Sequence, residues 1–250
     1  MAERQTREAY ILDRLARDGS LSVSALSRDL GVSAVTIRAS LRDLEGRGLL
    51  ARTHGGAQAS SFGSVLERQR QQAPEKERIA RAAAALVGDG DSIMLEAGTT
   101  TAAVIRHLSA RTGVQVVTNS TLAFAAARLN PVLRLLLTGG QFHAESESLV
   151  GYGALRAIAD FNVRRAFIGT DGFTAERGLT TQFADGADVI RAIHARAEET
   201  WLLADSTKYG RAGFVTVLPL PELTGVITDA GVGEESADAL RDAGIQVVLA

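Results

Sequence analysis

The chain contains 250 residues, of which 46% are hydrophobic and 22% are charged, and its formal net charge is −2. This composition is ordinary for a globular protein, and the length suits one small and one medium-sized domain. The chain has no cysteine, which excludes a disulfide framework and a thiolate metal site. No apolar run reaches the roughly 18 residues of a membrane helix, and the amino terminus opens on a helical pattern. We therefore expect a cytoplasmic protein with no membrane partner.

The first predicted element is a helix over residues 3–18. Its apolar side chains recur at helical spacing and are expected to face inward. These side chains are Ala9, Ile11, Leu12 and Leu15. A second, shorter helix follows, in which Ser22 caps the start and Leu26 and Leu30 lie one turn apart. Gly31 ends it, because glycine accepts the left-handed backbone that is common just past a helix.

A third predicted helix begins after this turn. Ser33 can cap its start, since the hydroxyl can accept a hydrogen bond from a free amide two or three residues later. Ile37, Leu41 and Leu44 recur at i, i+4 and i+7 and are expected to face the core. The residues left on or near the outer face are Ala34, Thr36, Arg38, Ala39 and Arg42.

A small basic hairpin is predicted next. Gly46 or Gly48 ends the helix, a strand starts at residues 49–50, and residues 52–56 form the tip and return of a wing. Together these elements are typical of a winged helix-turn-helix, which places its second short helix in the DNA major groove. The alternative is a small helical domain that binds a protein or only dimerises. The candidate DNA-binding residues are Ser33, Ala34, Thr36, Arg38, Ala39, Arg42, Arg52, Thr53 and His54.

Three segments follow from these patterns. Residues 1–57 are predicted to form the DNA-binding domain. Residues 58–75 are polar, with few apolar anchors, and are interpreted as a linker whose second half is helical. Residues 76–250 are predicted to form a larger domain.

Strand and helix patterns alternate in the larger domain, which favours a parallel or mostly parallel α/β sheet with helices on both faces. The predicted strands are residues 92–95, 114–117, 133–137, 166–168, 201–203, 226–227 and 245–249. The predicted helices include residues 101–108, 122–129, 187–199 and 235–243. In such sheets ligands bind beyond the carboxyl ends of the strands.

Polar motifs follow several of these strands, where glycines allow close backbone approach and hydroxyls and free amides attract an anion. The candidate effector-binding residues are Gly98, Thr99, Thr100, Thr101, Asn119, Ser120, Gly139, Gly140, Asp171 and Lys208. Asp171 has two interpretations: an acceptor for ligand hydroxyls, or a turn-stabilising residue before Gly172. Three scattered histidines, His107, His143 and His194, lack partners at metal-ligand spacing, so neither a metal nor a cofactor is expected.

The N-terminal motifs resemble the DNA-binding domain of the DeoR family of bacterial transcriptional regulators. That family's recognition segment reads roughly V-S-x-x-T-I-R-R-D-L-x-x-L, followed by a wing with R-x-H-G-G-A. Residues 32–44 and 52–57 match it except at two positions. Ala39 stands where the family usually has a second arginine, and Ser40 where it usually has aspartate. The resemblance implies an unchanged docking mode and an operator sequence of its own.

The C-terminal motifs resemble the same family, whose patterns there are D-A-G-T-T-T, T-N-S, G-G, G-x-D-G and D-S-S-K. The resemblance covers nearly the whole chain. It implies a sensor domain similar to sugar-phosphate isomerases and a small effector, commonly a phosphorylated sugar. It also implies a homo-oligomer, either a dimer or a tetramer, that represses a sugar operon on double-stranded DNA until the effector releases it.

Three departures from the family pattern concern the sensor. Ile190 occupies the position of a usual lysine, Glu96 replaces aspartate, and His143 replaces a frequent arginine. Arg191 is one residue further on and about 100° around the helix, so it is no automatic substitute for the lysine. Two alternatives stay open at this point: an isomerase-like enzyme with a DNA-binding head, and a repressor that no ligand affects. The sequence leaves the effector, operator, pathway and sign of regulation open.

Overall fold

The computed structural model describes residues 2–47, 49–59 and 61–250. The chain divides into two compact units. The first comprises the residues up to Gln71 together with Ala144–Ser146, and the second comprises Gln72–His143 and Glu147–Ala250. No helix in the described ranges is long and apolar enough to cross a membrane.

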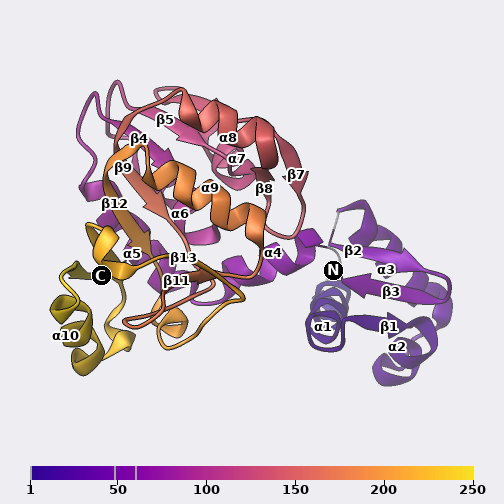
Figure 1. Cartoon of the computed structure of the whole chain (residues 1–250). Coiled ribbons are helices and arrows are strands. Elements are labelled where there is room, and N and C mark those ends of the chain that lie inside the picture. Colours follow the sequence, from indigo (N-terminus) through magenta and orange to yellow (C-terminus); the bar gives the residue numbers. More distant parts are fainter. Residues whose placement is uncertain (1, 48, 60) are drawn as a thin grey trace. The chain divides into compact units, whose positions relative to one another are not determined.

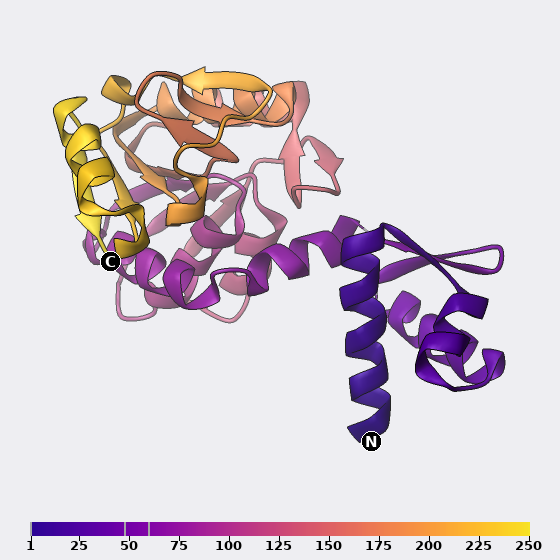
Figure 2. The ribbon, with the colours of Figure 1, turned by 90° about the horizontal axis from the view of Figure 1, so that it is seen from below.

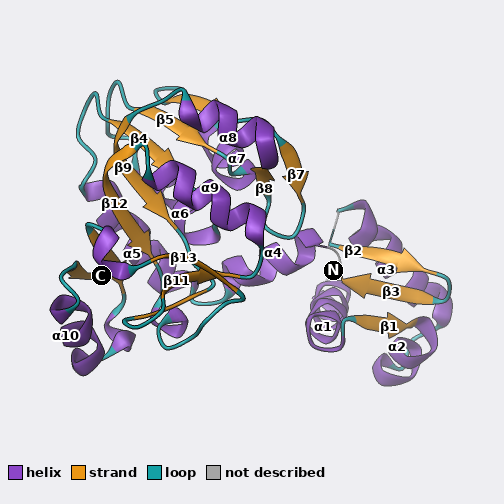
Figure 3. Cartoon of the chain, viewed as in Figure 1, coloured by secondary structure: helices purple, strands orange, loops and turns teal. Residues whose placement is uncertain are grey.

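The N-terminal unit is a winged helix-turn-helix, as predicted (Figures 2 and 3). It contains helices α1 (Ala2–Asp18), α2 (Val23–Leu30), α3 (Ala34–Gly46) and α4 (Ser61–Arg70), and strands β1 (Ser20–Ser22), β2 (Leu50–Thr53) and β3 (Gly56–Ala59). Helix α3 ends at Gly46, whereas Gly48 lies outside the described residues. Strand β1 was not predicted; it pairs antiparallel with β3 and widens the wing to three strands.

Two serine caps and one glycine define the helix-turn-helix. The Ser22 hydroxyl accepts a hydrogen bond from the Ala25 amide at 3.1 Å, and the Ser33 hydroxyl accepts one from the Thr36 amide at 3.2 Å. Gly31 has φ +64°, the left-handed conformation expected past the end of α2. The predicted helix limits at this turn are therefore confirmed.

The inward face of α1 differs from the prediction at one position. Ile11 and Leu15 are buried, but Ala9 is exposed and Glu8 is buried in its place. Glu8 is tolerated there because Arg4 Nε and Arg47 Nη1 each lie 2.7 Å from one of its carboxylate oxygens. Since Arg47 follows α3, this charge pairing holds α3 against α1.

The second unit contains a seven-stranded sheet in which all neighbours are parallel, as the strand–helix alternation indicated (Figure 1). The strand order is β15-β14-β12-β9-β4-β5-β6. The strands are β4 (Ser92–Leu95), β5 (Gln115–Thr118), β6 (Arg134–Leu137), β9 (Val163–Ile168), β12 (Ala197–Leu203), β14 (Gly225–Thr228) and β15 (Gln246–Leu249). The chain builds β5 and β6 on one side of β4 and later returns to place β9 on the other side, so the strand order reverses between β4 and β9.

Helices cover both faces of this sheet. The apolar side chains of α5 (Ala73–Ala85), α6 (Thr99–Val104) and α7 (Thr121–Ala127) form one core cluster, and those of α8 (Gly151–Ala159) and α9 (Ala184–His194) belong to the other. Helix α10 (Glu234–Asp242) packs beside β15. Along β9, Ala166 and Ile168 enter one cluster and Phe167 the other, which explains why a doubly covered parallel strand reads as a continuous apolar run.

The helix predicted over residues 187–199 is wrong at its C-terminal end. Helix α9 stops at His194, and β12 begins at Ala197 and pairs with β9 from Val163 onward. Pairing in the sheet overrides the helix-favouring residues Ala197, Glu198 and Glu199.

Several short elements were not predicted. A hairpin joins β7 (Gln141–His143) and β8 (Ser148–Val150), and a small antiparallel sheet contains β10 (Gly172–Thr174), β11 (Gly178–Thr181) and β13 (Val215–Leu218). Four 3-10 turns are η1 (Ile105–His107), η2 (Ser206–Lys208), η3 (Leu220–Glu222) and η4 (Ala230–Val232). The segment 58–75 contains the end of β3, helix α4 and the start of α5.

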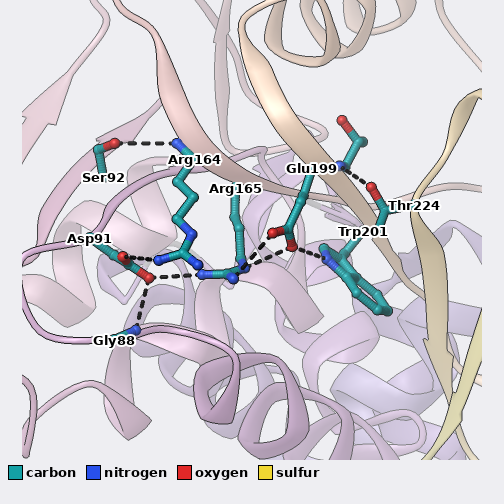
Figure 4. Close-up of polar contacts among 9 residues, drawn as sticks. Gly88, Asp91, Ser92, Arg164, Arg165, Glu199, Trp201 and Thr224 are labelled. Atoms are coloured by element: carbon teal, nitrogen blue, oxygen red, sulfur yellow. Dashed lines mark hydrogen bonds and ion pairs between the residues drawn. The ribbon is translucent and has the colours of Figure 1, made fainter.

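An ion-pair network joins three strands at their amino ends (Figure 4). Arg165 Nη1 lies 2.8 Å from an Asp91 oxygen, and Arg165 Nε lies 2.9 Å from a Glu199 oxygen. Arg164 adds a second contact to Asp91 at 3.1 Å, and Trp201 Nε1 donates to Glu199 at 3.2 Å. Burial raises the pKa of the Asp91 and Glu199 carboxyls, but the hydrogen bonds and guanidinium charges outweigh it and hold both below their usual range.

Arg165→Met is expected to lower the free energy of unfolding by about 3 kcal/mol, because it leaves Asp91 with Arg164 alone and removes the guanidinium that lies against Glu199. Urea denaturation of the full-length protein measures this change. The matched control is Arg241→Met on α10, whose partner Asp238 is exposed; it is expected to change stability by less than about 1 kcal/mol. Equal effects of the two substitutions would contradict a structural role for the buried network.

Candidate DNA-binding and effector sites

The outer face of α3 carries the candidate DNA-binding residues. Arg38, Ala39 and Arg42 are exposed, whereas Ala34 and Thr36 are half-buried. The Thr36 and Ser33 hydroxyls lie 2.9 Å apart and hydrogen-bond to each other beside the cap. These two hydroxyls are therefore engaged in starting the helix.

The arginines of this surface fall into two classes. Within the described part of the chain, Arg38 and Arg42 have no ion-pair or hydrogen-bond partner for their guanidinium groups. Arg52 on the wing is instead held by Glu45, with Nε 2.6 Å from a carboxylate oxygen, and this pairing lowers the pKa of Glu45. Arg38 and Arg42 are thus the cations of α3 available to another molecule.

The wing is held against the helix-turn-helix by its backbone. The turn of the hairpin contains exposed His54 and Gly55, and Thr53 precedes it. The Gly55 carbonyl accepts a hydrogen bond from the Val23 amide at 2.8 Å. A Cβ atom at Gly56 would lie 2.1 Å from the Leu21 carbonyl oxygen, so only glycine allows β3 to approach β1 this closely.

Ser40, one of the two departures in the recognition segment, has a structural role. Its side chain is buried, and its hydroxyl accepts a hydrogen bond from Arg7 Nε at 2.9 Å. The contact joins α3 to α1. Ser40 is therefore part of the scaffold that orients α3, whereas Ala39 lies on the surface.

The candidate effector residues lie at the carboxyl edge of the parallel sheet. The segments that follow β4, β5, β6, β9 and β12 contribute Gly98, Asn119, Gly139, Asp171 and Lys208, respectively. Because parallel strands end at the same edge, the sheet brings these segments to one side. The strand order reverses between β4 and β9, and in such sheets ligands bind beyond the carboxyl ends of the strands at this point.

Two predicted site hydroxyls point inward. Thr101 is fully buried and donates to the Gly98 carbonyl at 3.1 Å. Ser120 is also fully buried and accepts from the Ala123 amide at 3.1 Å, which caps α7. Both hydroxyls therefore shape the helix starts, while Thr99 remains half-buried at the edge.

Asn119 has an unused acceptor. The residue is 1% exposed, and its Nδ2 donates to the Leu149 carbonyl at 3.2 Å, which fixes the orientation of the amide. Its Oδ1 is buried and has no hydrogen-bond partner among the described residues. A buried acceptor left unpaired costs free energy, and a ligand donor would remove that cost.

Gly139 and Gly140 both have positive φ, +70° and +112°, and are exposed. A Cβ atom at Gly140 would lie 2.6 Å from the Val150 carbonyl oxygen and 3.0 Å from the Ala154 amide. Glycine at this position therefore lets the β6–β7 connection lie directly on the start of α8.

Asp171 and Lys208 are the charged groups predicted at this edge. Asp171 is exposed, and its carboxylate accepts from the Thr181 hydroxyl and from the Gln182 amide, both at 2.9 Å, which ties the segment after β9 to the end of β11. Lys208 ends the turn η2 that Asp205 caps. The residue is half-buried, and its ammonium has no side-chain partner in the part of the chain that the structure describes.

Glu96 is a site residue that was absent from the predicted set. It follows β4, its carboxyl is buried, and Oε2 accepts from the Gly169 amide at 3.0 Å, so it bridges the point where the strand order reverses. Burial is the largest cause that raises the pKa of Glu96, hydrogen bonds from the Gly169 and Ala97 amides oppose it, and the charge of Asp171 adds to it, so the pKa lies at about 8. The position directly after an apolar strand was visible in the sequence, but the burial was not.

Two of the sensor positions that depart from the family pattern, Ile190 and His143, have apolar or aromatic neighbours. Ile190 is buried in the core cluster beneath α9, so no cation replaces the lysine there. Arg191 donates to the Val217 and Thr216 carbonyls of β13, at 3.1 and 2.5 Å, and is engaged away from the strand ends. His143 stacks on Phe183 with ring centroids 4.2 Å apart.

The other two histidines have local partners. His107 Nε2 lies 2.8 Å from Glu77, and His194 Nδ1 lies 3.0 Å from the Thr200 hydroxyl. Across the described ranges, no group of three or more His, Asp or Glu side chains is arranged to hold a metal ion.

Comparison with known proteins agrees with this architecture. Residues 7–61 match the DeoR-like helix-turn-helix domain, and residues 71–230 match the DeoR C-terminal sensor domain. The chain belongs to the DeoR family. The family expected from the motifs is therefore confirmed, and the chain is a DNA-binding transcriptional regulator with a sensor domain.

Full-length relatives are also regulators. The regulator is 32% identical over 249 residues to the putative aga operon transcriptional repressor of Escherichia coli O157:H7, which covers 97% of this chain and 93% of that one. It is 30% identical over 233 residues to the lactose phosphotransferase system repressor of Streptococcus mutans, which covers 90% and 92%. Ribose 5-phosphate isomerase A of Methanocaldococcus jannaschii is similar over 55% of each chain, with 23% identity and a TM-score of 0.41.

Glu96→Gln is expected to change how stability depends on pH. Between the ordinary pKa of 4.5 and the raised value of about 8, the unfolded chain is ionised at Glu96 while the folded chain keeps its proton. The folded state binds more protons, so wild-type stability falls by up to about 1.4 kcal/mol per pH unit across that window. Glutamine does not titrate, so the free energy of unfolding of Glu96→Gln rises relative to that of the wild type up to about pH 8.

Urea denaturation at pH 5, 6.5 and 8 measures this difference. Glu235→Gln, at an exposed position of α10, is the control and is expected to follow the wild-type curve. A constant difference between Glu96→Gln and the wild type at all three pH values would show that Glu96 is ionised in the folded protein.

Proposed function

We propose that this regulator represses a carbohydrate-catabolic operon and that a small phosphorylated sugar, bound at the carboxyl edge of the sheet, releases it from its operator. The DNA-binding part of this proposal rests on Arg38 and Arg42, whose guanidinium groups lie on the exposed face of α3 and have no partner in the described structure. Two named relatives, the aga operon and lactose phosphotransferase system repressors, support a role as a repressor.

The proposed effector site combines three polar groups at one sheet edge. The Asn119 oxygen can accept from a ligand hydroxyl, and the protonated Glu96 carboxyl can donate to one. The Lys208 ammonium supplies a positive charge for a phosphate. A molecule with hydroxyls at one end and a phosphate at the other matches this set.

Release of DNA requires that the effector bind one state of the regulator better than the other. We expect a homo-oligomer, because helix-turn-helix proteins commonly bind paired half-sites as dimers. The regulator is expected to act in the cytoplasm, together with its operator.

Fluorescence anisotropy with the DNA beside the gene tests the proposal. The complex is titrated at fixed salt with a panel of phosphorylated and free sugars. Specific binding released by one phosphorylated sugar supports the full proposal. Specific binding that none of the compounds disturbs contradicts the effector half and leaves the DNA-binding half in place.

Arg38→Ala is expected to lower operator affinity about 10- to 100-fold, since a bidentate arginine contact to a base is worth about 1–3 kcal/mol. The fold should be unchanged, because Arg38 is exposed and has no partner in the described structure. Anisotropy on operator and on scrambled DNA measures the change. Arg17→Ala, at the exposed end of α1, is the control; an equal loss in both variants would argue against a specific role for Arg38.

Lys208→Ala is expected to raise the effector concentration needed for release about tenfold or more, since a hydrogen bond to a charged group is worth about 1.5–3 kcal/mol. Operator affinity without effector should stay within about twofold of the wild type. Lys208→Arg keeps the charge and is the matched control. Equal losses of DNA affinity and effector response in Lys208→Ala would place this residue outside the effector site.

A further inference from the structure

The exposed face of α3 contains an apolar side chain as well as its two arginines. Val35 is 73% exposed in the first turn of α3. Among the described side chains of the N-terminal unit, Val35 is the one large apolar side chain that is exposed. The apolar side chains of Leu26, Ile37, Leu41 and Leu44 are buried in the core. A single exposed apolar residue needs no explanation on an ordinary surface, but the position of Val35 on the recognition helix does.

Helical spacing places Val35 beside the other exposed residues of this face. Ala39 lies one turn further on, at i+4, and Arg38 and Arg42 lie at i+3 and i+7. The four side chains therefore form one strip with an apolar part nearest the helix start and cations along it. Residues near the start of a recognition helix are the ones that reach base edges in the major groove.

The polar groups near the helix start are already used. The Ser33 hydroxyl accepts from the Thr36 amide, and the Ser33 and Thr36 hydroxyls bond to each other. Of the three first-turn side chains at positions 34–36, Val35 is exposed whereas Ala34 and Thr36 are half-buried, so the Val35 methyl groups are the ones presented to a base. In the major groove, the apolar feature of a base pair is the 5-methyl group of thymine.

We propose that Val35, with Ala39 behind it, reads the 5-methyl group of a thymine in each operator half-site, next to the bases that Arg38 and Arg42 contact. This rests on the docking of α3 in the major groove. A turn of helix rises about 5.4 Å and a base-pair step about 3.4 Å, so Val35 and Ala39 face positions one or two steps apart.

The experiment removes the methyl group and nothing else. The full-length protein first selects its binding sequence from a pool of randomised double-stranded DNA. Each thymine of the selected sequence is then replaced singly by deoxyuridine, which pairs identically but lacks the methyl, and affinity is measured by anisotropy. At one thymine per half-site we expect about a fourfold loss for one replaced base, as burial of one methyl-sized group is worth about 0.8 kcal/mol.

Two variants assign that loss to Val35. Val35→Ala should bind the thymine probe more weakly and lose most of its sensitivity to the replacement at that position. Arg42→Ala, the matched control on the same face, should bind more weakly but keep the wild-type sensitivity. Because Val35 is exposed, the unfolding midpoint of Val35→Ala should match the wild type, which separates a change in recognition from a change in folding.

The possible results distinguish this inference from DNA binding itself. If no replacement of thymine by deoxyuridine changes the affinity for the selected DNA, the proposed recognition of a thymine methyl group is wrong, while DNA binding itself is established. Sensitivity that Val35→Ala retains in full also overturns the proposed recognition. A pool from which no sequence is enriched contradicts specific DNA binding by α3 and, with it, the basis of this inference.

Discussion

The structure of the sensor unit depends on one constraint: parallel strands cannot be joined by tight hairpins. Each strand of the seven-stranded sheet must be followed by a crossover, so all strands end at the same edge and helices cover both faces. The two covered faces explain the apolar run of β9, and the common edge explains why residues as distant in sequence as Gly98 and Lys208 belong to one region. The chain returns to place β9 beside β4, and Glu96 after β4 accepts a hydrogen bond from the Gly169 amide after β9, which joins the two strands where the strand order reverses.

The two edges of this sheet differ in how their polar groups are satisfied. At the amino ends, Asp91, Arg165 and Glu199 neutralise one another at close range, which tolerates their burial and joins three strands. At the carboxyl ends, Glu96 has only a backbone donor and a like charge nearby, and the Asn119 oxygen has no partner in the described structure. The first edge is complete as a scaffold. At the second edge the Asn119 oxygen is left for the effector that we propose, since pairing a buried acceptor lowers its free-energy cost.

The sequence was sufficient to predict an element where the residues that stabilise it are close to it in the chain. Ser22, Ser33 and Gly31 act within a few residues of themselves, so the helix limits were predictable, and the seven strands were visible as apolar runs. Features set by distant residues were not. Glu8 replaces Ala9 on the inner face of α1 because Arg47 lies opposite, and residues 197–199 join the sheet because β9 lies alongside. The burial of Glu96 and of Thr101 likewise depends on elements far away in the sequence.

The same distinction separates scaffold from function in the DNA-binding unit. Arg4 is held by Asp43, Arg47 by Glu8, Arg52 by Glu45 and Arg7 by Ser40, and each of these contacts fixes one element against another. Arg38 and Arg42 are of the same residue type on the same small domain, yet the described structure offers them no partner. Composition cannot tell these arginines apart, since their difference lies in which carboxylates the fold brings within reach. Exposed cations beside an exposed valine, on a helix anchored through Ser40 and Arg47, are the chemistry of a surface built to meet phosphates and base edges.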